Sequence, residues 1–283
     1  MADVYFESDA GQRFAFGKAG SNSYGMSIGN GMDIALGTSQ GFSQIGETVQ
    51  TQSVAGRLID AKGEFYGSRI EERKDALRNA CAPMSAGRLV FWETWFIRVF
   101  VKSAPTFSAK KGDGRFMMQF FAPFPFFSRM EEAVHSIGEV KKEFRLPINY
   151  SKPHRFGTTS AEKATSVRNE GDVEVKFRVD IFARGTCNDV TISNLDSREK
   201  MTINGELVAG DRVAVYQDDN GALRAELTRN GETTDILGRI DDDSDLFRLK
   251  PGENPLAATE RDGKSAMTVR FTFHPARAVL YES

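Results

Sequence analysis

Hydrophobic and polar residues alternate most regularly between residues 173 and 183, where the sequence reads VEVKFRVDIFA. Apolar residues occupy the odd positions up to Ile181, and charged residues occupy the even positions up to Asp180. A period of two predicts a β-strand with one face buried and the other face in water. The pattern therefore places a half-buried strand in the second half of the chain.

Further strand patterns around this segment predict an antiparallel β-sandwich over residues 167–256. Three more strand-like runs follow, at residues 189–194, 199–205 and 212–236. Asn-Gly pairs interrupt the last run at 220–221 and 230–231. Asparagine and glycine tolerate the positive φ angles of tight hairpin turns, so we expect two antiparallel hairpins here.

The first half of the chain also has the pattern of a β-protein. Strands are predicted at residues 13–17, 32–36, 49–57, 57–61, 87–101 and 115–127. A Gly-rich stretch at 17–31 is typical of a long loop, and we expect turns at 104–105 and 111–114. Most of the first half is therefore expected to form a sheet.

Two capping-box sequences predict helices within this β pattern. SRIE at 68–71 begins a charged amphipathic segment that runs to about Ala80, and SRME at 128–131 begins a short one that runs to about Ile137. In a capping box the serine hydroxyl accepts a bond from an exposed amide, and the glutamate reaches back to the cap. One helix is therefore expected to pack on the sheet, and a second, shorter helix is expected to follow it.

The length of 283 residues suggests two domains, because domains usually contain about 100 to 200 residues. We expect a mainly β protein. Residues 1–140 form a sheet or sandwich with one packed helix near 69–81, and residues 141–283 form an antiparallel β-sandwich. The last strand is free to return to the first domain.

Composition narrows the classes of function. The 37 basic and 39 acidic residues give a net charge of −2, so neither nucleic acid nor an anionic membrane is an expected partner. No apolar run reaches the roughly 18 residues that a transmembrane helix needs. Two cysteines far apart in the sequence suit a protein made in the cytoplasm.

Motifs that carry chemistry are missing from the sequence. His135, His154 and His274 lie far apart, and Cys81 and Cys187 supply no closely spaced pair of zinc ligands. Phosphate loops, dinucleotide-binding turns and nucleophile elbows do not occur. We therefore expect a protein that is not an enzyme and that has no catalytic residue, cofactor or metal site.

Two features of the acidic residues allow other interpretations of the function. The run DDDSD at 241–245 offers carboxylates to calcium, but it lacks the residue order of a helix-loop-helix calcium loop, and a solvated turn is the simpler interpretation. Paired carboxylates of a glycosidase are spaced in three dimensions, so the sequence does not test them. A cell-wall glycosidase is therefore kept as a third hypothesis.

Phenylalanine is the unusual residue, with 22 copies against 6 tyrosines and 2 tryptophans. Apolar residues occupy both the odd and the even positions of the strand at 115–127, so both of its faces are apolar. This suits a strand covered on both faces, either by a second layer or by another subunit. Aromatic side chains are enriched in such contacts. The candidates for contacts between subunits or domains are Trp95, Phe120, Phe121, Phe124 and Phe126.

The order of several segments resembles the distal tail (Dit) proteins of long-tailed bacteriophages. In the first half the segments are GRLIDAKGEF (56–65), ERKDALRNAC (72–81), PMSAGRLVFW (83–92), IRVFVKSAPTF (97–107) and FMMQFFAPFPFF (116–127). In the second half they are NEGD (169–172), TISN (191–194), GELVAGDRVAVY (205–216), SDLFRLKPGEN (244–254) and MTVRFTF (267–273). The similarity extends from about residue 50 to residue 275.

This resemblance implies a structural protein of the virion tail tip, or baseplate, that is assembled in the host cytoplasm. Members form homo-hexameric rings through the first domain, which stacks on the major tail tube protein, and they dock the tail-associated hub protein. A galectin-like second domain faces outward and holds receptor-binding proteins or stays bare, which links it to host recognition. The implied function is thus assembly.

The alternative is a lectin-like module that binds a receptor or carbohydrate through residues 167–256. Galectins hold sugars on a tryptophan platform, yet Trp92 and Trp95 both lie in the first half of this chain. Some relatives insert a carbohydrate-binding module into the second domain, and 283 residues leave no room for one. Both points favour the assembly reading.

Overall fold

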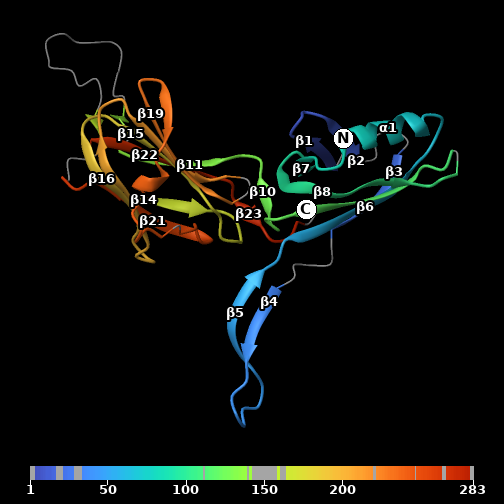
Figure 1. Ribbon diagram of the computed structural model, residues 1–283, viewed down its shortest axis with the longest axis horizontal. Helices are drawn as coiled ribbons and strands as arrows, with labels where there is room; N and C mark the ends of the chain where they lie inside the picture. The colour runs from blue at the N-terminus through green and yellow to red at the C-terminus, as the bar shows by residue number, and fades with distance from the viewer. Residues whose placement is uncertain are drawn as a thin grey trace. The chain divides into compact units, whose positions relative to one another are not determined.

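The computed structural model describes residues 4–16, 22–28, 34–110, 112–138, 140–141, 158–159, 164–218, 221–245, 247–262 and 266–280. The chain forms two compact units (Figure 1). The first unit contains residues 1–130 and 277–283, and the second contains residues 131–276. The division predicted from the sequence lies ten residues later, after residue 140.

The first unit is built on one antiparallel sheet with the strand order β2-β1-β7-β8-β9-β6-β3. Its strands are β1 (Val4–Ser8), β2 (Arg13–Phe16), β3 (Asn22–Ile28), β6 (Arg57–Phe65), β7 (Ala86–Phe91), β8 (Trp95–Phe107) and β9 (Arg115–Ala122). A short strand, β10 (Phe127–Arg129), pairs with the start of β8. Strands β4 (Ile34–Ser39) and β5 (Thr48–Val54) pair with each other as a separate hairpin.

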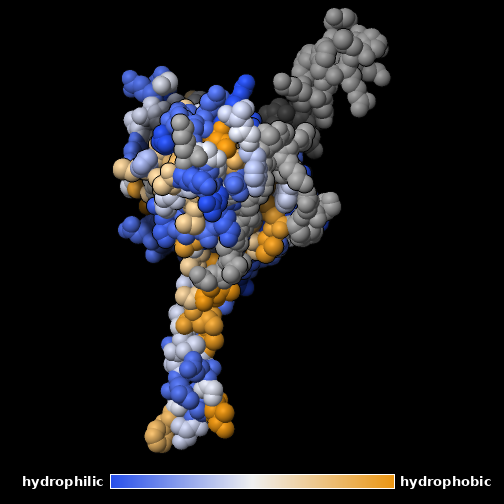
Figure 2. All heavy atoms as spheres, turned by 90° about the vertical axis from the view of Figure 1, so that its right-hand side faces the viewer, coloured by the Kyte–Doolittle hydropathy of each residue, from blue (hydrophilic) through white to orange (hydrophobic). Residues whose placement is uncertain are grey.

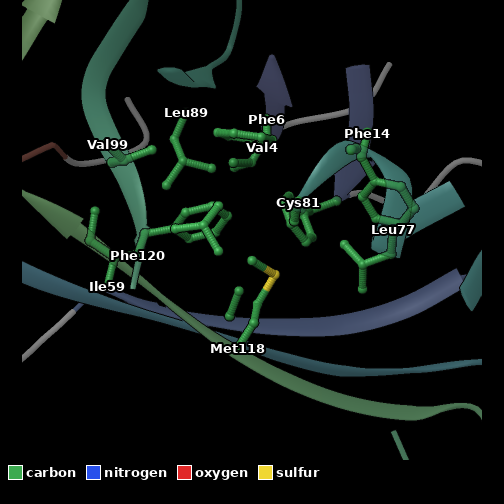
Figure 3. Close-up of a cluster of buried hydrophobic side chains, with 14 of the residues drawn as sticks. Val4, Phe6, Phe14, Ile59, Leu77, Cys81, Leu89, Val99, Met118 and Phe120 are labelled. Carbon is green, nitrogen blue, oxygen red and sulfur yellow. The ribbon is translucent and has the colours of Figure 1, made fainter. Parts of the chain in front are cut away.

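Phenylalanine side chains fill the core of the first unit (Figure 3). Phe6 and Phe120 have no exposed surface, and their ring centroids lie 5.2 Å apart. The single described helix of the unit, α1 (Ile70–Ala80), contributes Leu77 to the same cluster. Alternate residues of β9 face this core, because successive side chains of a strand point to opposite faces.

The second unit consists mainly of a six-stranded sheet and a four-stranded sheet, which confirms the expected mainly β fold. The larger sheet has the order β11-β22-β15-β18-β19-β20, and the smaller has the order β14-β21-β16-β17. The larger sheet contains β11 (Ala133–Ile137), β15 (Arg178–Ala183), β18 (Arg212–Gln217), β19 (Leu223–Arg229), β20 (Glu232–Asp235) and β22 (Met267–Phe273).

The smaller sheet contains β14 (Ala164–Asn169), β16 (Cys187–Asn194), β17 (Lys200–Leu207) and β21 (Gly252–Thr259). Three minor elements complete the described part of the unit: β12 (Val140–Lys141), β13 (Thr158–Thr159) and the 3-10 turn η1 (Leu237–Arg239). The last short strand, β23 (Ala276–Arg277), lies where the chain leaves the second unit. The segment from Arg277 onward belongs to the first unit.

The second capping box does not start a helix, so that prediction was wrong. Residues 127–129 form β10, and residues 133–137 form β11, which pairs with β22 from Ala133↔Phe273 to Ile137↔Val269. Pairing with β22 satisfies the hydrogen-bonding groups of the backbone, and this pairing overrides a local helix signal. The first helix is present, but its N-cap is Arg69 and no side chain caps it, so the capping role of Ser68 was also wrong.

Three predicted elements of the first unit have different bounds. The single strand expected at 87–101 is the hairpin of β7 and β8, because Trp92 and Glu93 take positive φ angles and turn the chain. Pro105 lies inside β8 rather than in a turn, next to irregular register that tolerates a missing amide donor. Part of the loop expected at 17–31 is the strand β3, which pairs with β6.

The Asn-Gly turns of the second unit differ from each other. Asn230 and Gly231 have φ angles of 54° and 86° and join Arg229 directly to Glu232, which is the expected two-residue turn. The other hairpin is wider, because its last pair is Gln217↔Leu223. Asn220 lies outside the described residues. Strand β15 begins at Arg178, so the strand predicted from residue 173 starts five residues too early.

Candidate assembly surfaces

The five predicted contact residues occupy three different environments in the first unit. Phe120 faces the core, where Phe6 and Phe16 surround its ring, so it offers no surface to a partner. Its neighbour Phe121 points to the other side of the sheet and is 36% exposed. The sequence could not separate the two faces of β9, because apolar residues occupy both parities of that strand.

Phe124 and Phe126 lie in the turn after β9, and both are half-buried. Their rings pack edge to face with centroids 5.1 Å apart, so each ring already covers part of the other. Trp95 at the start of β8 is also half-buried, and the Arg277 guanidinium lies 4.9 Å from its ring centroid. These three aromatic residues therefore have intramolecular partners as well as exposed edges.

Phe121 belongs to an apolar row that crosses the outer face of the sheet. Leu58 of β6 pairs with Phe121, and Phe121 pairs with Phe100 of β8, so these three side chains lie side by side. Met117, four residues earlier on the same face of β9, is 60% exposed. Gly56 leaves room for the Phe121 ring, since a Cβ there would lie 2.5 Å from its Cζ. We call Leu58, Phe100, Met117 and Phe121 the apolar row.

The hairpin of β4 and β5, which we call the arm, has no core of its own. Nearly every residue of its two strands is exposed. Leu36 and the paired residues Ile34 and Val54 share one face, because directly opposed residues of an antiparallel pair point the same way. Alternate positions carry small or polar residues, so the arm is amphipathic.

The tip of the arm exposes two more large apolar side chains. Phe42 and Ile45 lie in the loop between β4 and β5, and both are fully exposed, with relative exposures of 105% and 102%. Figure 2 shows hydrophobic residues gathered along the arm. Sequence reasoning treated this region as ordinary strands and missed the surface, although the alternation of Ile34 and Leu36 with small residues was a visible signal.

The described residues do not form a recognisable chemical site. Among them, no group of three or more His, Cys, Asp or Glu side chains is placed to hold a metal ion. Burial raises the pKa of the Cys81 thiol to about 12, and burial together with Glu260 raises that of Cys187 to about 11. Both thiols are therefore protonated and unreactive at neutral pH.

Histidine and acidic positions also have ordinary structural partners. His135 stacks on Phe273 with ring centroids 6.1 Å apart, and His274 lies 3.6 Å from a Glu132 carboxylate oxygen. His154 lies outside the described residues. In the acidic run, Asp241 accepts bonds from the Asn204 amide and from the backbone of residue 243, as a turn residue does. No helix in the described ranges is long and apolar enough to cross a membrane.

Known proteins with the same architecture occur in phage tails. Residues 170–274 match the family model of the siphovirus-type tail component, C-terminal domain. The whole chain is similar to the crystal structure of the Dit protein of phage SPP1, which is described as a paradigm of the hub adsorption apparatus in phages that infect Gram-positive bacteria. That similarity has a TM-score of 0.64 at 14% identity and covers 95% of this chain and 98% of the other.

A second similar structure comes from the baseplate of phage P2 in its activated conformation with Ca. It has a TM-score of 0.46 at 10% identity and covers 95% of this chain and 97% of the other. The sequence matches none of the curated proteins.

The residues that match the siphovirus-type tail component, C-terminal domain, all lie in the β-sandwich of the second unit. Residues 170–274 therefore match the tail-component family, and the fold of the chain is similar to that of the SPP1 Dit protein, in agreement with the order of its sequence segments.

Proposed function

We propose that this chain forms a homo-hexameric ring at the distal end of a phage tail tube and that the first unit makes the contacts between subunits. A structural role in the phage tail or baseplate is supported by the match of residues 170–274 to the tail-component family and by the fold shared with the SPP1 Dit protein. The proposal of a ring rests on the arm, because the exposed apolar face of this amphipathic hairpin needs another surface to cover it.

The geometry of the exposed surfaces suits a ring. The apolar face of the arm and the apolar row are two different surfaces of one subunit, so an arm packed on the row of the next subunit makes a head-to-tail contact. Head-to-tail contacts close into rings when the rotation between subunits allows it. Burying an apolar side chain of this size stabilises a contact by about 1.5 to 3 kcal/mol. A few such side chains, together with the arm tip, are enough for a stable interface.

The remaining partners follow from the same position in the virion. The ring would stack on the major tail tube protein on one side and hold the tail-associated hub protein on the other. The second unit would then be available for receptor-binding proteins. In this scheme the protein is made and assembled in the cytoplasm of the bacterial host and acts without catalysis.

A galectin-type sugar site is less well supported. Both tryptophans of the chain, Trp92 and Trp95, lie in the first unit, so the second unit has no tryptophan platform. The lectin reading therefore requires a different way of holding a sugar.

The mass of the protein in solution tests the ring. Light scattering after size exclusion should give a hexamer for the natural chain at high protein concentration. The double variant Phe42→Ser with Ile45→Ser should be monomeric, because the arm tip then has no apolar group to bury. Met84→Ser is the matched control, since Met84 is 96% exposed and lies outside the arm and the apolar row. A natural chain that stays monomeric, or an arm variant that stays hexameric, would contradict the proposal.

A further inference from the structure

The outer face of the six-stranded sheet carries an array of arginines. Side chains of β15, β18 and β22 that point away from the sandwich core include Arg178, Arg212 and Arg270. The same face holds Asp180 and Phe182. We call these five residues the arginine face.

Aromatic rings hold the guanidinium groups of this face in place. The guanidinium carbons of Arg212 and Arg270 lie 5.1 and 5.5 Å from the ring centroid of Phe182. Arg178 lies 4.8 Å from the ring centroid of Tyr216 on the neighbouring strand. Cation–π contacts of this kind limit side-chain freedom, so less entropy is lost when a ligand binds.

Asp180 balances only part of the positive charge. Its carboxylate accepts two bonds from Arg178, at 2.9 and 3.0 Å, and one from Arg212 at 3.3 Å. Burial alone would raise the pKa of this carboxyl, but the hydrogen bonds and charges of these arginines outweigh burial and hold its pKa below the usual value. Asp180 is thus an anion at neutral pH, and its bonds orient Arg178 and Arg212.

The charges on this face do not cancel. Three guanidinium groups and one carboxylate give 3 − 1 = +2 on the outward sides of β15, β18 and β22. Arg270 lies directly across from Asp180 in the strand register. Within the described part of the chain, its guanidinium has the Phe182 ring as its neighbour and no hydrogen-bonded anion. The next strand, β19, adds Arg224 and Glu226, which leave the sum unchanged, and the edge strand β20 adds Asp235 opposite Glu226, which lowers the sum to +1.

The chemistry of this face suits a hydrophilic anion rather than an apolar protein surface. Protein interfaces usually have an apolar centre, whereas the one apolar side chain in this array, Phe182, lies beneath Arg212 and Arg270. Planar guanidinium groups match carboxylate and phosphate oxygens in pairs. Thr272, on the same side of β22, adds a hydroxyl group that suits the hydroxyls of a sugar, whereas the Thr268 hydroxyl already donates to the Gly138 carbonyl at 3.1 Å.

We propose that the arginine face of the second unit binds an anionic polysaccharide through its phosphate or carboxylate groups. This role goes beyond ring assembly and does not depend on it, because the arginine face lies in the second unit and the ring contacts lie in the first. It is also a way of holding a glycan that needs no tryptophan platform.

Binding of defined polymers to the full-length protein tests this site. The probes are polygalacturonate and poly(glycerol phosphate) as anionic glycan-type chains, dextran as a neutral chain and polyglutamate as an acidic polypeptide. Titration calorimetry should show binding of at least one anionic glycan-type chain but not of dextran. The affinity should fall as salt is raised, because salt screens exposed charges.

The variant Arg212→Gln with Arg270→Gln should raise the Kd by about tenfold or more, since each lost charge-assisted contact has a measurable effect. Arg178 is left in place so that Asp180 keeps its main partner. The matched control, Arg168→Gln with Arg198→Gln, removes two charged side chains outside this sheet face and should leave the Kd unchanged. Arg270→Gln alone is the second variant if the double variant unfolds, because Arg270 is exposed and stacks on the Phe182 ring without an ion pair to another described residue.

Three results would overturn the proposal: no binding of either anionic glycan-type chain, equal affinity in the natural chain and the arginine variant, or binding of polyglutamate alone, which would point to an acidic protein partner. The oligomeric mass of the arginine variant should equal that of the natural chain. A failure of glycan binding is therefore distinguishable from a failure of ring assembly.

Discussion

The arm and the arginine face are both sheet surfaces open to water, and their chemistry is opposite. The arm exposes Leu36, Phe42 and Ile45 without a core beneath them. The arginine face exposes charged groups whose geometry is set by Phe182 and Asp180. An apolar surface in water is favourable only once it is covered, so the arm indicates permanent assembly. A charged surface is stable in water, so the arginine face suits reversible binding.

The largest effect is expected when the core beneath the apolar row is changed. Phe120→Ala should destabilise the first unit by about 3 to 5 kcal/mol, because a buried ring is lost and a cavity remains. Chemical denaturation measures the change. The control is Phe121→Ala on the opposite face of β9, which should have a clearly smaller effect on stability and a larger effect on the mass of the proposed hexamer. Equal losses for both variants would remove the distinction between core and contact surface.

An intermediate effect is expected from a charge pair in the second unit. Asp211 is buried and accepts bonds from Arg229, at 2.8 and 2.5 Å, and from the Val208 amide at 2.8 Å. Asp211→Asn should lower the free energy of unfolding by about 1 to 3 kcal/mol at neutral pH, because a charge-assisted network is lost. The exposed turn residue Asp242, changed to Asn, is the control.

The same pair gives a pH dependence with a defined sign. The hydrogen bond from Arg229 is the main cause that holds the pKa of Asp211 below its ordinary value of 3.8. Its contribution to stability is therefore present above about pH 4 and is lost as pH falls through the lowered pKa. Acid denaturation curves of the natural chain and Asp211→Asn should converge at low pH. Curves that stay parallel would show that Asp211 does not stabilise the fold through its charge.

The smallest effect on folding is expected in the arm. Leu36→Thr with Val54→Thr keeps residues that favour strands and removes exposed apolar groups, so the stability of the isolated subunit should change by less than about 0.5 kcal/mol. Thermal unfolding at a concentration where the protein is monomeric measures it. A large loss would mean that the arm packs on its own subunit, and the contrast with the arginine face would no longer hold.

Much of this fold was predictable because local patterns and final contacts agree. The charged segment after Ser68 is the helix α1, and the alternating runs of the second half are strands of a sandwich. The Asn230-Gly231 turn forms as expected, because its backbone angles suit a tight hairpin. The predictions fail where pairing with a strand distant in sequence determines the local structure. Residues 133–137 follow a helix-start signal, but they form a strand that pairs with β22.

The candidate surfaces were less predictable than the fold. The doubly apolar strand at 115–127 correctly indicated that both faces of β9 carry apolar groups, yet it did not show that Phe120 is buried and Phe121 exposed. The arm was missed, because exposure depends on whether another element packs against a strand. The arginine face was missed because its members come from three strands that are far apart in the chain.

The sequence by itself determined the mainly β architecture, the position of the one described helix and the resemblance to distal tail proteins, because these follow from periodicity, turn residues and the order of segments. Only the tertiary structure decided which side of β9 meets the core, that the arm has an uncovered apolar face and that Arg212 and Arg270 share the ring of Phe182. These features arise when strands distant in sequence become neighbours. A linear pattern specifies the faces of a strand but not what will lie against them.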